Sequence, residues 1–206
     1  MAHRRLFAAL EPPPAIRTRL LAAMGGVADA RWQTDGQLHA TLLFIGEVNR
    51  HVADEVAIRL AALRAPAVSV SLGGFGTFDS GPGRRITALW IGLEPVAALT
   101  ALHRRVLACL APAGISPEPR RFLPHVTLAR FPARGVPPAA LERFLSRSLA
   151  PRGGWQAREV VLYESHLTRG GAHYEPLLRV PLEPPAGAAE GEAARGSSAG
   201  PRPPAA

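Results

Sequence analysis

Two similar tetrapeptides decide the fold of this chain: His39-Ala40-Thr41-Leu42 and His125-Val126-Thr127-Leu128. The second begins 86 residues after the first. Alternate residues of a strand project to the same face, so the histidine and the threonine of each tetrapeptide lie together, opposite the apolar residues. Each tetrapeptide is therefore predicted to form a strand with a polar front and an apolar back. Its recurrence predicts a duplicated unit.

The segments around the tetrapeptides follow a similar order in both halves. We predict helices after the proline run 12–14, from Asn49 to Leu63, and over 95–110 and 137–149. We predict strands over 6–10, 38–45, 124–129, 158–167 and 174–182, and a hairpin of strands 68–72 and 85–93 joined by the glycine-rich connection 73–83. This order predicts an α+β fold: a bilobal duplicated unit with two antiparallel sheets flanking a central cleft and helices on the outside.

The composition divides the chain into a folded body and a tail. The body, residues 1–183, is predicted to be one domain with two pseudo-symmetric lobes, roughly 1–94 and 95–183. The remaining 23 residues, 184–206, contain eight Ala, five Pro and four Gly and no large apolar residue. Such a segment cannot bury enough surface to offset its ordering entropy, so we predict that it is disordered and that its deletion leaves activity intact.

Charge and cysteine content narrow the class of protein. With 47% hydrophobic and 19% charged residues, the chain is typical of a folded globular protein rather than of collagen or a disordered tail. Its net charge of +8 favours an acidic ligand, and every basic residue is arginine, which a GC-rich genome would also produce. The single cysteine, the absence of a signal peptide and the absence of a long uncharged apolar run predict a cytoplasmic protein without membrane contact.

Two inward-facing imidazoles beside hydroxyl groups suit acid–base chemistry at phosphorus. One histidine can accept a proton while the other donates one, and neither step needs a metal. Threonine hydroxyls and a nearby arginine, of which Arg130 is the natural candidate, would stabilise charge on the phosphate oxygens. The alternatives are that the histidines are structural, or that His39 and His125 bind a metal with His166 or His173. No metal-ligand spacing supports the metal site.

At this point the sequence resembles a known family, the bacterial and archaeal RNA 2',3'-cyclic phosphodiesterases, also called 2'-5' RNA ligases, of the 2H phosphoesterase superfamily. The resemblance covers about residues 4–182. Beyond the paired His-x-Thr-Leu motif, it is carried by the segments Arg5–Leu10, Leu38–Val48, Phe122–Arg130, Leu162–Ser165 and Tyr174–Leu177.

The resemblance implies hydrolysis of a terminal 2',3'-cyclic phosphate to a 2'-phosphate. It assigns His39 as the general acid on the leaving 3'-oxygen and His125 as the general base for water, with Thr41, Thr127 and Arg130 binding the phosphate. Strand alternation, however, places Arg130 on the face opposite His125. Arg130 is thus expected to reach the cleft only if the strand ends or bulges near Ala129.

The expected substrate is RNA with 2',3'-cyclic phosphate ends, such as tRNA fragments. The expected enzyme is a monomer that uses no cofactor and no metal, and the reverse reaction, 2'-5' RNA ligation, would use the same site. Two alternatives stay open. One is a non-catalytic RNA-end binding protein. The other is a phosphodiesterase for a small cyclic nucleotide or a 2',5'-linked oligonucleotide.

Overall fold

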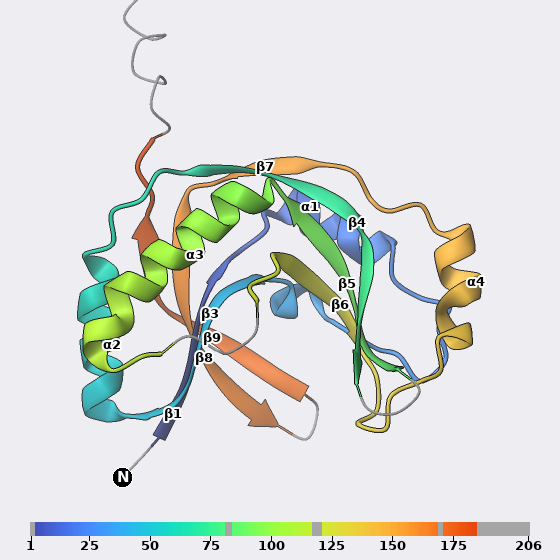
Figure 1. Cartoon of the computed structure of the whole chain (residues 1–206), viewed down its shortest axis with the longest axis horizontal. Helices are drawn as coiled ribbons and strands as arrows, with labels where there is room; N and C mark the ends of the chain where they lie inside the picture. The colour runs from blue at the N-terminus through green and yellow to red at the C-terminus, as the bar shows by residue number, and fades with distance from the viewer. Residues whose placement is uncertain (1–2, 81–83, 117–120, 169–170, 185–206) are drawn as a thin grey trace, which may run out of the picture.

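The computed structural model describes residues 3–80, 84–116, 121–168 and 171–184, and these form a mixed structure of helices and strands (Figure 1). The helices are α1 (Pro14–Ala22), α2 (Arg50–Ala61), α3 (Val96–Leu110) and α4 (Ala139–Arg147), with short 3-10 turns η1 (Asp35–Gln37) and η2 (Ala111–Ala113). The strands are β1 (His3–Leu10), β2 (Arg31–Trp32), β3 (Ala40–Asn49), β4 (Val68–Ser80), β5 (Arg85–Glu94), β6 (His125–Arg130), β7 (Gly154–Ala157), β8 (Glu159–Thr168) and β9 (Gly171–Pro181).

Two antiparallel sheets confirm the predicted fold class. A four-stranded sheet has the order β3-β1-β8-β9, and a five-stranded sheet has the order β2-β6-β5-β4-β7. In the first, β1 lies between β3 and β8, and in the second, β5 lies between β6 and β4. Strand β3, which follows His39, pairs with β1 at the edge of the first sheet, and β6, which begins with His125, pairs with β5 in the second. The two places differ in one respect, because β2 pairs with the other side of β6.

The boundary between the lobes differs from the expected division at residue 94. The four-stranded sheet joins β1 and β3 of the first half to β8 and β9 of the second, and the five-stranded sheet likewise joins strands of both halves. Lobes built on these sheets are therefore not the contiguous segments 1–94 and 95–183. The physical reason is that antiparallel pairing joins β1 to β8, so the first and last parts of the body form one sheet.

One core connects the sheets to the helices. Apolar residues of β1, β3, β5 and β6 pack in the same cluster as Val56 and Leu60 of α2 and Leu99 and Leu102 of α3. Helix α2 begins where its sequence predicts, because the Asn49 side chain accepts a hydrogen bond from the Val52 backbone N–H at 3.0 Å. Helices α2 and α3 cover one side of the molecule and α4 lies at the opposite side (Figure 1).

The hairpin β4–β5 is longer than predicted. Residues 73–80, expected to be a loop because of their glycines, continue β4, and residues 75–80 pair with β5. Gly76 lies opposite Trp90, and a methyl group at position 76 would overlap the indole ring. The glycine therefore admits a large side chain from the neighbouring strand rather than breaking the strand.

Helix α3 and the turn after it, Val96–Ala113, are long and apolar enough to cross a membrane by length and mean hydropathy alone. Arg104 and Arg105 lie in the middle of this segment, and Leu102, Val106 and Leu110 are buried in the protein core. These features identify a core helix with one exposed face. The tail predicted to be disordered, residues 184–206, lies outside the described residues except for Pro184.

Candidate active site

His39 immediately precedes β3 and packs against aromatic rings on the front of the four-stranded sheet. Its Nδ1 lies 2.8 Å from the backbone carbonyl oxygen of Gln37. The ring centroid lies 4.8 Å from that of Phe7 and 4.9 Å from that of Tyr174. Because a carbonyl oxygen only accepts, Nδ1 carries the proton, and Nε2 is left for chemistry.

His125, the first residue of β6, has the same local arrangement in the other sheet. Its Nδ1 lies 2.7 Å from the carbonyl oxygen of Leu123. The ring centroid lies 4.9 Å from Phe78 and 5.7 Å from Trp90. Each motif histidine thus has Nδ1 at the backbone carbonyl of the residue two positions earlier and its ring against aromatic side chains. In each, Nε2 makes no contact with that carbonyl and can take part in proton transfer.

A β-bulge in each motif strand sets which side chains follow the histidine. In β6, Thr127 pairs with Trp90 and Ala129 pairs with Leu89, so Leu128 is an extra residue. Leu128 and Ala129 are both fully buried, and Arg130 is exposed. The bulge therefore restores Arg130 to the face of His125, which resolves the conflict that simple alternation predicted.

The first motif contains the equivalent bulge. Thr41 pairs with Ala9 and Leu43 pairs with Ala8, which leaves Leu42 as the extra residue in β3. Both bulges thus fall on the leucine of a His-x-Thr-Leu tetrapeptide. The two motifs therefore share a β-bulge at the same position as well as a similar sequence.

A cavity of about 240 Å³ joins the two sheets beside His39. It brings together His39 and Thr41 with Arg130, and no aspartate or glutamate of the described residues lines it. The described lining residues are Arg5, Phe7, Arg31, Gln33, Gln37, His39, Thr41, Phe44, Arg130, Ser165, Leu167, Ala172 and Tyr174. The cavity is therefore suited to an anion rather than to a cation.

A second cavity, of about 350 Å³, lies beside His125. It is lined mainly by apolar side chains, among them Phe78 and Phe122, and Thr41 and Phe44 line both cavities. The two cavities are therefore neighbouring parts of one cleft. Thr127 is half-buried on β6 and lines neither of them, so of the five expected site residues it is the least exposed to the cleft.

Burial and positive charge keep both imidazoles neutral at neutral pH. The pKa of His39 is lowered to about 4, chiefly by burial and also by the charges of Arg130 and His125, while the hydrogen bond to the Gln37 carbonyl acts in the opposite direction. Burial also lowers the pKa of His125 from its ordinary value, again with Arg130 acting in the same direction and the Leu123 carbonyl opposing it. An anion bound in the cleft would favour the protonated forms.

The sequence analysis did not identify Arg5, Arg31 or Phe7 as parts of this site. Alternation along β1 contained a usable signal, because Arg5, Phe7 and Ala9 share the face opposite the buried Leu6, Ala8 and Leu10. Arg31 had no such signal, since β2 has only two residues.

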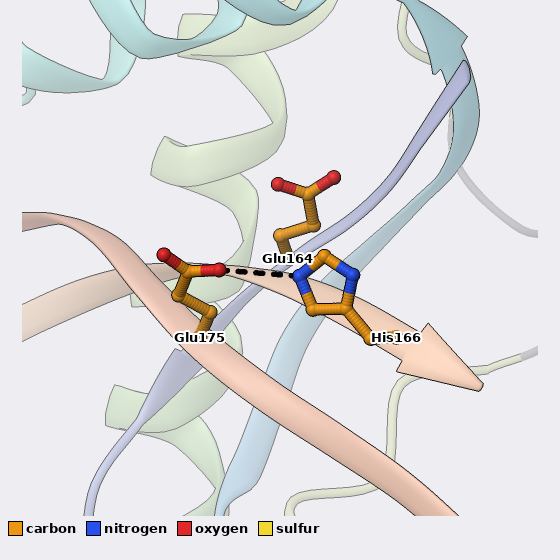
Figure 2. A group of neighbouring side chains, drawn as sticks. All are labelled: Glu164, His166 and Glu175. Carbon is orange, nitrogen blue, oxygen red and sulfur yellow. Dashed lines mark hydrogen bonds and ion pairs between the residues drawn. The ribbon is translucent and has the colours of Figure 1, made fainter. Parts of the chain in front are cut away.

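A separate cluster of titratable side chains lies on the other face of the β8–β9 ribbon. Figure 2 shows Nε2 of His166 facing a carboxylate oxygen of Glu175, at 3.2 Å, with Glu164 next to them. Glu164 also accepts two hydrogen bonds from Arg4, at 2.9 and 2.6 Å. Ser165 and Tyr174 are cross-strand partners next to this cluster, and their side chains line the cleft. Because neighbouring residues of a strand project to opposite faces, the cluster faces away from His39. We interpret it as an ion-pair network.

Comparison with known proteins identifies the family of this paired-histidine cleft. A sequence model of the 2'-5' RNA ligase superfamily matches residues 12–169. The chain belongs to this superfamily. The resemblance that the two tetrapeptides indicated is thereby confirmed.

Relatives within the 2'-5' RNA ligase superfamily share most of their length with this chain. An RNA 2',3'-cyclic phosphodiesterase of Aeropyrum pernix is 35% identical over 147 residues, which make up 71% of this chain and 82% of the relative. An RNA 2',3'-cyclic phosphodiesterase of Escherichia coli is 28% identical over 183 residues, 85% of this chain and 95% of the relative. The crystal structure of E. coli LigT complexed with 3'-AMP superposes with a TM-score of 0.70 at 26% identity, covering 88% of this chain and 99% of that one.

Proposed function

We propose that this chain hydrolyses the terminal 2',3'-cyclic phosphate of RNA to a 2'-phosphate, with His39 and His125 as a metal-independent acid–base pair. The names of the relatives support the reaction class. The observation that carries the proposal is the pair of histidines, each with Nδ1 at a backbone carbonyl, beside a cleft whose described lining includes arginine and contains no carboxylate.

The reaction needs one proton removed and one supplied. Water attacks phosphorus and gives its proton to Nε2 of neutral His125, while the bond from phosphorus to the 3'-oxygen breaks and that oxygen takes the proton from Nε2 of protonated His39. The product is a 2'-phosphate monoester with a free 3'-hydroxyl. Exchange of one proton with water at each histidine then restores the starting state.

Arg130 and the two threonines are assigned to the phosphate. Arg130 has two roles: its guanidinium stabilises the negative charge that grows on the non-bridging oxygens, and its charge lowers the pKa of both histidines in the free enzyme. A bound phosphate anion offsets that charge and favours protonated His39. Substrate binding thus prepares the general acid.

Incubation of the full chain with an oligoribonucleotide ending in a 2',3'-cyclic phosphate, in the presence of EDTA, tests the reaction. We expect a 2'-phosphate product, resolved from the 3'-phosphate by chromatography. A 3'-phosphate product would reverse the assignment of the leaving oxygen. Absence of any product with this substrate, combined with turnover of a small cyclic nucleotide or a 2',5'-linked oligonucleotide, would transfer the mechanism to that substrate.

Substitution of each histidine tests the mechanism. His39→Ala and His125→Ala should each reduce kcat by about 100-fold or more, because general acid and general base each contribute roughly 10²–10⁴-fold. His51→Ala is the matched control, since His51 is exposed on α2 outside the cleft. Substantial turnover by both cleft variants would contradict the mechanism, and RNA binding without turnover by the native chain would indicate a non-catalytic end-binding protein.

A further inference from the structure

Three arginines from three different strands surround the cavity beside His39. Arg5 lies on β1, Arg31 on β2 and Arg130 on β6, and all three line the same cavity of about 240 Å³. None of the three forms an ion pair with a residue in the described part of the chain. Arg4, the residue before Arg5, lies on the other face of β1 and forms an ion pair with Glu164.

Two of these cations are placed directly against each other. Arg31 and Arg130 are cross-strand partners in the β2–β6 ladder, so their side chains leave the same face of the sheet. Like charges directly opposite each other destabilise a sheet, and within the described part of the chain no carboxylate lines the cavity to offset them. The arrangement becomes favourable when an anion lies between or above the two guanidinium groups.

A buried polar side chain completes this part of the cavity. Gln33 is 7% exposed, lines the cavity, and its side-chain amide makes no hydrogen bond with any described residue. Nearby, Gln37 is fixed by donating from Nε2 to the carbonyl oxygen of Ala172 at 2.7 Å. Arg5 is held at the rim over the Phe44 ring, with its guanidinium carbon 5.0 Å from the ring centroid. Gln33 therefore adds an amide to the lining of this cavity that could donate a hydrogen bond to an anion.

The reacting phosphate accounts for only one of these cations. In the proposed function, Arg130 binds the phosphate that also contacts His39 and His125, and Arg5 and Arg31 remain without a counter-charge. We propose that Arg5 and Arg31, with Gln33, bind a second phosphate: the phosphodiester on the 5' side of the terminal nucleotide. This inference rests on the proposed function and specifies its substrate as a chain end rather than a free nucleoside cyclic phosphate.

The side of the cleft agrees with this assignment. His39 protonates the 3'-oxygen of the terminal nucleotide, so that nucleotide lies on the His39 side, where the arginines are. The next phosphate along the chain then follows the terminal ribose past Arg5 and Arg31. Because these contacts are made to phosphate, they recognise the chain irrespective of base sequence.

A binding experiment tests the second phosphate without relying on turnover. The probes are adenosine 2'-phosphate, which matches the product end, and adenosine 2',5'-bisphosphate, which adds the second phosphate, compared by calorimetry at one ionic strength. We expect the native chain to bind the bisphosphate about tenfold or more tightly, since charge-assisted hydrogen bonds are among the strong ones. Arg5→Gln and Arg31→Gln should each reduce this ratio severalfold.

Arg104→Gln is the control with the same loss of charge, because Arg104 is exposed on α3 and lines neither cavity. It should leave the ratio unchanged, and thermal unfolding of all three variants verifies that they are folded. The proposal is overturned if the native chain binds both probes equally, or if the Arg5 and Arg31 variants keep the native ratio. It is also overturned if Arg104→Gln lowers the ratio as much, because that would indicate an effect of net charge alone.

A turnover experiment separates this inference from the proposed function. The substrates are adenosine 2',3'-cyclic phosphate and a dinucleotide with the same cyclic phosphate end, and the readout is the ratio of their kcat/KM values. We expect the native chain to favour the dinucleotide, and Arg5→Gln and Arg31→Gln to lower the ratio. If neither substrate is turned over, the proposed function fails, and the binding ratio still decides whether the second phosphate site exists. If both are turned over equally by the native chain, the proposed function stands and the second site is contradicted.

Discussion

Two sets of interactions act in opposite directions on the pKa of His39 and of His125. The carbonyls of Gln37 and Leu123 fix the rings and favour the charged form, whereas burial and the charge of Arg130 favour the neutral form. The neutral form prevails, and the pKa of His39 falls to about 4. In the free enzyme the protonated acid is therefore a minor species at neutral pH.

The pH dependence of kcat/KM follows from these lowered pKa values. Because kcat/KM reports the free enzyme, both limbs of its bell-shaped profile should lie below the ordinary histidine pKa of about 6.5. The value of kcat/KM should already be declining when the pH rises past about 6.5, because His39, the general acid, has lost its proton in most molecules of the free enzyme. The measurement is kcat/KM for a cyclic phosphate end across about pH 4 to 8. An alkaline limb above about pH 7 would contradict this account of the free enzyme.

The same lowered pKa makes His39 a source of acid sensitivity. An unfolded chain binds a proton at His39 near pH 6.5, and the folded chain resists it until about pH 4, so stability is lost as the pH falls through this window. At about pH 4.5 the loss from His39 alone is on the order of 2–3 kcal/mol.

Urea unfolding of the native chain and of His39→Asn, at about pH 7 and about pH 4.5, measures this contribution. Over that interval, we expect the free energy of unfolding of the variant to fall by about 2–3 kcal/mol less than that of the native chain. His51→Asn, on the exposed face of α2, should behave as the native chain does. Equal losses in native chain and His39→Asn would exclude His39 as the cause.

At the level of secondary structure, the bulges in β3 and β6 are the features that assemble the site. Each bulge lets two consecutive residues turn to the buried side and returns the next residue to the cleft, which brings Arg130 to the face of His125. In the first sheet the corresponding position is occupied by Phe44, which lines both cavities. The duplicated strands thus place a cation on one side of the cleft and an aromatic ring on the other.

The hairpin β4–β5 supports His125 through Trp90. Gly76→Ala should displace the indole, because the added methyl group overlaps it, and Trp90 in turn contacts His125. We expect a loss of about 1–3 kcal/mol in the free energy of unfolding, with lower kcat and a shifted tryptophan fluorescence spectrum. Gly74→Ala is the matched control on the same strand, since the space around Gly74 is open. If both variants behave alike, Trp90 has no positioning role.

For the whole molecule, the folding of both halves into each sheet creates a cleft with an unbalanced charge. The net charge of +8 is spread over the chain, but the cleft gathers Arg5, Arg31 and Arg130, and the lining residues that the structure describes include no carboxylate. Such a field favours polyanions at long range, and its effect is screened by salt.

The salt dependence of RNA binding should therefore increase with the number of phosphates bound. For single strands, the logarithm of the affinity falls with the logarithm of the salt concentration by about 0.7 per phosphate neutralised. We expect a clearly steeper slope for a short oligoribonucleotide with a 2'-phosphate end than for a nucleoside 2'-phosphate. Fluorescence anisotropy, or calorimetry for the smaller ligand, over a range of salt concentrations provides both slopes. Equal slopes would mean that the cleft holds one phosphate only.

The sequence by itself determined the elements and the two histidines. Strand periodicity, proline and glycine positions and the Asn49 cap act locally, so helices such as α2 and the motif strands begin close to where their residues predict. The recurrence of His-x-Thr-Leu was enough to infer the duplication and to name His39, Thr41, His125 and Thr127 as site residues, and the roles of these residues stay predictions.

Only the tertiary structure decided the sheet partners, the bulges and the composition of the cleft. Pairing of β1 with β8 joins residues far apart in the chain, and no local pattern contains that choice. The bulge at Leu128 depends on the register against β5, so alternation alone placed Arg130 on the wrong face. Arg31 lies opposite Arg130 only because β2 pairs with β6, which is why the arginine cluster was not visible in the sequence.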